Sequence, residues 1–296
     1  MKRWFCLVFL IPLLLLPGCG QAVAEAGTEN ALRIVATSFV PYDFTREITG
    51  GSAGLTMLLP PASDSHSFEP TVQDILMIQN CDVFIYGGGE SDVWVESLLR
   101  TLEPSRMKII RIIDCVEDNG AAQDEHVWTS PINAKRIAQA IADAVCEANE
   151  ANSELYMSNT AGYLQKLDDL DAAFHAVIGG AARNTIVFGD RFPFRHLADA
   201  YGLTYFAAFP GCSDKTEAGA KAIALLIRKV RDENIPVVFH TELSNRQTAE
   251  TIRESTGAKI LPMYACHTVS REDFLGGVTY LELMTRNVEA LKEALW

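Results

Sequence analysis

Short runs of β-branched and aromatic residues recur along the chain, separated by longer stretches in which apolar residues return every three or four positions. The short runs predict β-strands, and the longer stretches predict amphipathic helices. The expected strands are residues 32–36, 55–59, 83–86, 108–113, 185–188, 204–207, 235–239 and 259–263. Because strands and helices alternate, we expect an α/β fold with parallel sheets.

One long helix is predicted in the middle of the chain. Apolar residues at helical spacing form a single stripe that ends at Gly179-Gly180, namely Tyr163, Leu167, Leu170, Phe174 and Val177. The helix stands between two β/α series, so we expect it to join two lobes. The predicted lobes are 32–150 and 181–296, and the linking helix is 151–180.

The N-terminus is predicted to be a secretory signal over residues 1–18, with Lys2 and Arg3 before an apolar run that ends at Leu16. Leu16-Pro17-Gly18-Cys19 looks like a bacterial lipobox, in which Cys19 would carry lipid, followed by a polar tether over 19–31. An uncleaved anchor is the alternative, but the run is short for a bilayer span. We therefore expect an exported, extracytoplasmic protein, lipid-anchored at the cell membrane.

Composition narrows the class of partner. The formal net charge is −13. This charge argues against binding to nucleic acid and would not repel a cation. The three glycines Gly87–Gly89 predict a turn, since the lysine and Ser/Thr of a phosphate loop do not follow them.

Three of the six histidines fall in loops at the ends of predicted elements: His66, His126 and His267. His126 precedes Ser130 and Pro131, which favour the start of a helix. Neutral imidazole is the commonest protein ligand for transition metals. Each histidine alone suits an ordinary loop, but the three together predict a metal site in the crevice beyond the strand ends.

The motifs around the first two histidines carry a family resemblance. Residues 34–43, the run His66-Ser67-Phe68-Glu69-Pro70-Thr71 and the run Asp124-Glu125-His126-Val127-Trp128 are similar to the zinc/manganese solute-binding lipoproteins of bacterial ABC transporters. The resemblance implies a monomer of two β/α lobes joined by a long helix. It also implies metal binding by His66 and His126 and delivery to a membrane ABC permease. A closed ligand shell without an open position means capture of the ion, so we expect no enzymatic reaction.

The second lobe departs from that family pattern, so its ligands are inferred from position. His267 is the expected third ligand, and Glu242 or Asp190 the fourth. His240 is an outside candidate, and His196 is interpreted as structural. Three imidazoles and one carboxylate would suit tetrahedral Zn²⁺, whereas a second carboxylate would favour Mn²⁺.

Two other classes of function are weighed against metal capture. A zinc-dependent hydrolase would need an open metal position and a general base, and neither a His-Glu-x-x-His helix nor a Gly-x-Ser-x-Gly elbow occurs. A metal-free surface adhesin is the other alternative, and metal analysis separates it from a receptor.

Of the five cysteines beyond Cys19, Cys212 and Cys266 both follow strands of the second lobe, so they form the expected disulfide of an exported protein. Their bridge would hold the His267 loop. The alternative is that one thiolate is itself a metal ligand.

Overall fold

The computed structural model describes residues 31–102, 106–117, 124–209 and 219–296, and Leu32–Trp296 form one compact unit. Two four-stranded parallel sheets have the orders β2-β1-β3-β4 and β6-β5-β7-β8. The strands are β1 Arg33–Ala36, β2 Gly54–Met57, β3 Val83–Tyr86, β4 Lys108–Arg111, β5 Thr185–Phe188, β6 Thr204–Ala207, β7 Val237–Thr241 and β8 Lys259–Met263. The predicted α/β class with two parallel sheets is confirmed.

Helices connect the strands, as expected for parallel pairs. They are α1 Phe39–Thr49, α2 Val72–Gln79, α3 Val93–Leu99, α4 Pro131–Ala148, α5 Ser153–Gly179, α6 Arg195–Tyr201, α7 Ala220–Asp232, α8 Gln247–Thr256, α9 Arg271–Leu275 and α10 Tyr280–Leu295. The long linking helix is α5, with 27 residues. The short α9 was not predicted, and its start is fixed by the Ser270 side chain, which accepts a hydrogen bond from Asp273 N–H.

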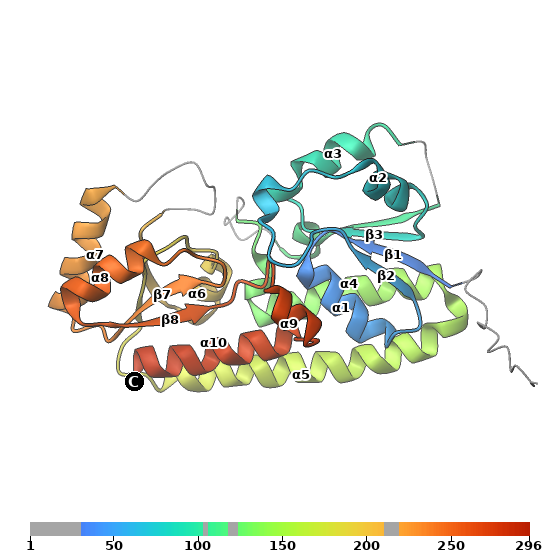
Figure 1. Ribbon diagram of the computed structural model, residues 1–296. Coiled ribbons are helices and arrows are strands. Elements are labelled where there is room, and N and C mark those ends of the chain that lie inside the picture. Colours follow the sequence, from blue (N-terminus) through green and yellow to red (C-terminus); the bar gives the residue numbers. More distant parts are fainter. Residues whose placement is uncertain (1–30, 103–105, 118–123, 210–218) are drawn as a thin grey trace, which may run out of the picture. The chain divides into compact units, whose positions relative to one another are not determined.

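The central strands β1, β3, β5 and β7 are buried on both faces, which explains their continuous apolar runs, whereas the edge strands are partly exposed. Along β3, Val83 and Ile85 face one cluster of buried side chains while Phe84 faces another, as the two-residue period of a strand requires. The first cluster is shared by both sheets and includes side chains of α5 and α10. These two helices run side by side beneath the sheets (Figure 1), so one continuous core joins the two lobes. The lobe limits at residues 150 and 181 stay predictions.

Both sheets repeat the same strand order, with a switch point between their two central strands. In the first sheet Thr37, after β1, donates its hydroxyl to Asp92 Oδ2, after β3, at 3.4 Å. In the second sheet Asp190, after β5, accepts the backbone N–H of Thr241 at the end of β7 at 3.0 Å. Ligands of open α/β sheets bind beyond the strand ends at such points.

None of the helices in the described part of the chain combines the length and apolar character needed to cross a membrane. The predicted signal, Cys19 and most of the tether lie outside the described residues.

The stripe along α5 can be tested by two substitutions in the same helix. Leu167 is fully buried, whereas Met157 is 66% exposed. Leu167→Ala should lower the free energy of unfolding by about 2–5 kcal/mol, because it removes apolar contacts and leaves a cavity. Met157→Ala is the control and should change it by less than about 0.5 kcal/mol. Denaturant titration measures both, and equal effects would contradict a core role for this stripe.

Candidate metal centre

His66 lies on a single 3₁₀ turn, Ser65–Ser67, in the loop that follows β2. The turn is capped by Asp64, whose Oδ1 accepts the backbone N–H of His66 at 3.0 Å. The ring Nδ1 is 3.1 Å from the Ser91 hydroxyl oxygen, and Nε2 is 4.0 Å from Glu125 Oε1. Nε2 is therefore the nitrogen that faces the other candidate ligands.

His126 is almost completely buried just before the 3₁₀ turn Val127–Thr129 and helix α4. Asp124 Oδ1 accepts both its backbone N–H, at 3.0 Å, and its ring Nδ1, at 2.7 Å. Burial would raise the pKa of the Asp124 carboxyl, but the hydrogen bonds from His126 hold that pKa below its ordinary value. With Nδ1 bonded to Asp124, Nε2 is left to face the cleft.

His267 lies in the loop between β8 and α9, and its backbone is fixed by hydrogen bonds two and three residues earlier. Ala265 O accepts the Trp128 indole N–H at 2.7 Å, and Ala265 N–H donates to Glu242 Oε2 at 2.9 Å. The Asn287 side chain bonds both the N–H and the carbonyl of Tyr264, each at 2.8 Å. The loop is thus held from α10, from β7 and from the segment next to His126.

The three predicted histidines come together in this structure. His267 Nδ1 is 3.2 Å from His126 Nε2, and the ring centres of His66 and His267 are 5.8 Å apart. Burial first, and then His126 and His66, lower the pKa of His267 well below its ordinary value. A neutral imidazole keeps the lone pair that a metal ion needs.

Glu125 is the acidic member of this cluster, and the sequence did not single it out. Its Oε1 is 3.8 Å from His267 Nδ1, and it forms with His66 and His267 a group whose ligand atoms all lie within 4.8 Å of one another. The only signal for it in the sequence was its place between Asp124 and the predicted ligand His126. Asp124 turns to the His126 ring, whereas Glu125 turns to Ser91.

Glu242 and Asp190, the two predicted carboxylate ligands, line the same cleft of about 810 Å³ as the histidines. Burial raises the pKa of Glu242 to about 7, although the hydrogen bond from Ala265 N–H opposes this. Asp190 Oδ2 accepts both the N–H and the hydroxyl of Thr241. Each of these carboxylates therefore holds backbone next to the cleft, and neither belongs to the tight group around Glu125.

The two remaining histidines of interest are buried outside the cluster. His196, in α6, places its ring Nε2 2.9 Å from the carbonyl of Asp124, so it braces the His126 segment from the second lobe. His240 lies within β7 with Nδ1 2.7 Å from Thr241 O, and burial lowers its pKa. The strand extends two residues further than predicted, which places His240 inside the sheet.

Cys266 is fully buried, and its thiol forms no disulfide among the described residues. Its predicted partner Cys212 lies outside the described residues, so the bridge stays a prediction. Burial raises the pKa of the Cys266 thiol well above its ordinary value, which opposes the thiolate that metal binding would need. The backbone of Cys266, directly before His267, is left-handed, with a φ of 60°.

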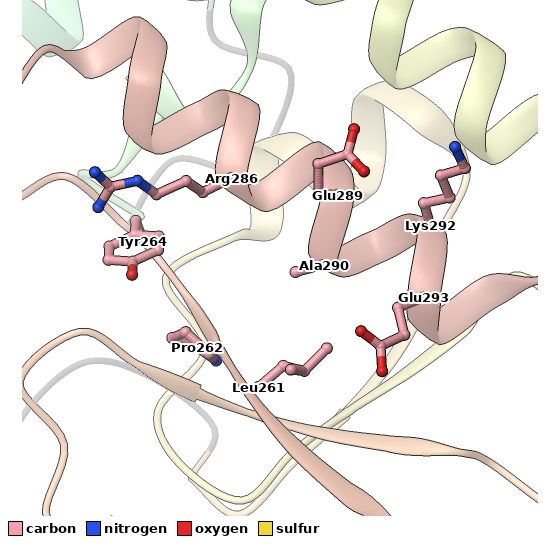
Figure 2. A pocket seen from close by; sticks show the side chains of 8 residues that line it. All are labelled: Leu261, Pro262, Tyr264, Arg286, Glu289, Ala290, Lys292 and Glu293. Atoms are coloured by element: carbon pink, nitrogen blue, oxygen red, sulfur yellow. The ribbon is translucent and has the colours of Figure 1, made fainter.

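A second hollow, of about 560 Å³, lies between β8 and α10 and is lined by Leu261, Pro262, Tyr264, Arg286, Glu289, Ala290, Lys292 and Glu293 (Figure 2). It contains no histidine or cysteine. Arg286 lies over the Tyr264 ring and pairs with Asp273 at 3.3 Å. This hollow therefore lacks the imidazole nitrogens of the predicted site, and the histidine cleft is the candidate metal site.

The fold has two linked α/β lobes, and imidazole side chains converge beyond the strand ends. This arrangement is that of a solute-binding protein with a metal site. Residues 34–294 match the family described as zinc-uptake complex component A, periplasmic, and the chain belongs to this family. The protein is thus a solute-binding component of zinc uptake, a transport role and not an enzymatic one, as the sequence predicted.

Similar proteins cover nearly the whole chain. The high-affinity zinc uptake system protein ZnuA of Bacillus subtilis is 27% identical over 99% of this chain and 98% of its own length. The zinc-binding lipoprotein AdcA of Streptococcus pneumoniae is also 27% identical over 99% of this chain, which spans only 61% of AdcA.

Solved structures agree with the fold. The metal-dependent lipoprotein YcdH of Bacillus subtilis superposes with a TM-score of 0.81 at 27% identity, over 90% of this chain and 100% of that one. The Zn(II)-bound ZnuA-like domain of Streptococcus pneumoniae AdcA gives a TM-score of 0.78 at 29% identity, over 90% of this chain and 99% of that domain.

The contribution of the Trp128–Ala265 hydrogen bond to stability can be measured by comparing Trp128 with a second tryptophan, Trp94. Trp128→Phe leaves a buried carbonyl without its donor and should lower the free energy of unfolding by about 1–3 kcal/mol beyond the loss of ring volume. Trp94→Phe is the matched control, because the Trp94 indole N–H has no hydrogen-bond partner within the described residues. Equal destabilisation by the two variants would contradict a specific role for the Trp128 bond.

Proposed function

We propose that this protein captures Zn²⁺ through His66, His126, His267 and Glu125 and delivers it to a membrane ABC permease. The observation that carries the proposal is the convergence of three imidazole nitrogens and one carboxylate oxygen. Family membership supports the transport role. Lipidation at Cys19 would keep the receptor at the outer face of the membrane, and the zinc-binding lipoprotein AdcA is a precedent for such an anchor.

The spacing of the donor atoms supports a tetrahedral ion. Ligand atoms at 2.0–2.1 Å from zinc and at tetrahedral angles lie about 3.4 Å apart. The separations here are 3.2 Å between His126 and His267, 3.8 Å between His267 and Glu125, and 4.0 Å between His66 and Glu125. His126 lies outside the group of ligand atoms within 4.8 Å of one another, so the cluster would have to close around the ion to complete the four-ligand shell.

The same donor set argues for zinc ahead of manganese. Imidazole nitrogen suits zinc, whereas Mn²⁺ favours a larger share of oxygen ligands. Glu242 and Asp190 each accept a backbone N–H through one carboxylate oxygen, and neither belongs to the group of ligand atoms within 4.8 Å of one another that contains Glu125. We therefore place Glu125 as the carboxylate ligand, and Glu242 and Asp190 as residues that hold the loops of the cleft.

Removal of each histidine tests the site. His66→Ala, His126→Ala or His267→Ala should each lower zinc affinity by more than about 100-fold. Loss of a residue that only hydrogen-bonds a ligand typically costs roughly 10–100-fold, and loss of the ligand itself should cost more. Metal-free thermal unfolding shows whether each variant is folded, a check that matters most for the almost completely buried His126. His175→Ala is the control, since that side chain is 60% exposed on α5. Competition with a chromophoric chelator measures affinity, and wild-type affinity in all three variants would refute the site.

Zinc should also stabilise the fold. A ligand that binds only the folded state adds RT ln(1 + [L]/Kd) to the free energy of unfolding, about 4 kcal/mol at a thousandfold excess over Kd. Thermal unfolding of chelator-stripped protein, with and without added zinc, measures this shift. The shift should disappear on adding chelator and be smaller with manganese. No shift with either metal would favour the metal-free adhesin.

A further inference from the structure

The turn that follows β3 places a serine between two of the proposed ligands. Ser91 is 6% exposed, and its backbone N–H donates to Glu125 Oε2 at 2.9 Å. Its hydroxyl donates to Glu125 Oε1 through a short hydrogen bond and lies 3.1 Å from His66 Nδ1. The hydroxyl oxygens of Ser91 and Ser65 are 3.4 Å apart, a longer and weaker contact. One buried side chain thus contacts both a proposed imidazole and a proposed carboxylate ligand.

The number of protons shared among Ser91, Glu125 and His66 decides which tautomer His66 adopts. A serine hydroxyl has one proton to donate, and an ionised carboxylate can only accept. If that proton lies on the bond to Glu125, the contact with His66 needs its proton from the ring. His66 is then protonated at Nδ1 and carries its lone pair on Nε2, the nitrogen that faces the other ligands. Histidine ligands of metals commonly have their second nitrogen fixed in this way.

The glycines before Ser91 are needed to bring the turn this close. Gly89 has a φ of +87°, and a Cβ added there would lie 2.5 Å from Glu125 Oε2 and 2.6 Å from Glu125 Cβ. Gly88 has a φ of +83°, and its N–H donates to Asp92 Oδ2 at 3.1 Å. The turn predicted at Gly87–Gly89 is therefore shaped to pack directly against the Glu125 side chain.

We propose that Ser91 is a positioning residue of the zinc site, an inference that rests on the proposed function. Its hydroxyl holds His66 in the Nδ1–H form with Nε2 directed at the ion, and it turns Oε1 of Glu125 toward the same point. Glu125 Oε1 keeps a second lone pair for the metal while it accepts from Ser91.

The tautomer of His66 is measured in metal-free protein labelled with ¹⁵N at histidine, where long-range ¹H–¹⁵N spectra distinguish the two ring nitrogens. His66→Ala assigns the signal. Wild-type protein should show a protonated Nδ1 and an unprotonated Nε2. Ser91→Ala should shift His66 toward the Nε2–H form and lower zinc affinity about 10–100-fold. Ser91→Thr, which keeps the hydroxyl, should restore both.

Ser67→Ala is the matched control, because it removes an exposed hydroxyl from the same turn as His66, where the hydroxyl donates to Asp64 O. It should leave both the tautomer and the affinity unchanged. Metal-free melting temperatures show whether each variant is folded. An Nε2–H form of His66 in wild-type protein, or an unchanged tautomer in folded Ser91→Ala, would overturn the positioning role. Failure of wild-type protein to bind zinc would instead overturn the proposed function, and the tautomer measurement distinguishes the two cases.

Discussion

The site depends on the buried hydrogen bond from the Trp128 indole N–H to the carbonyl of Ala265. It ties the segment that carries His126 to the loop that carries His267, 137 residues apart in sequence. The Tyr280 hydroxyl donates in turn to Trp128 O at 2.7 Å, so α10 supports the same contact. Because an unpaired buried carbonyl is costly, this arrangement of the loop is favoured over others. The 3.2 Å approach of His126 and His267 follows from it.

The residues at the switch points of the two sheets have different roles, and this difference explains why the first lobe provides more of the proposed ligands than the second. In both sheets an aspartate bridges the switch point, Asp92 to Thr37 in the first and Asp190 to Thr241 in the second. In the first lobe the neighbouring Ser91 contacts His66 and Glu125, so the turn also serves the cluster. In the second lobe the carboxylate of Asp190 is used within the sheet itself. Three of the four proposed donors therefore come from the first lobe.

The sequence predicts the strands and the histidines well because both leave local signals. Continuous apolar runs identify strands buried on two faces, and His66, His126 and His267 stand out as rare residues at element ends. The direction of an acidic side chain in a loop has no such signal. Glu125 turns inward because Ser91, from a segment 34 residues away, donates two hydrogen bonds to it. Glu242 is drawn to Ala265 N–H, 23 residues on, and neither partner is visible in local sequence.

The carboxylates around the cleft all hold backbone near the candidate ligands, and Glu125 is in addition a proposed ligand. Each of them accepts a backbone N–H beside a candidate ligand. The acceptor and donor pairs are Asp64 with His66, Asp124 with His126, Glu125 with Ser91, Asp190 with Thr241, and Glu242 with Ala265. A metal hydrolase needs a carboxylate or imidazole that is available to take a proton from bound water, and an open position for that water. Here Glu125 is a proposed ligand, and the other four carboxylates each accept a backbone N–H around the cleft. Rigid loops with neutral nitrogen donors suit a receptor that binds an ion and leaves it chemically unchanged.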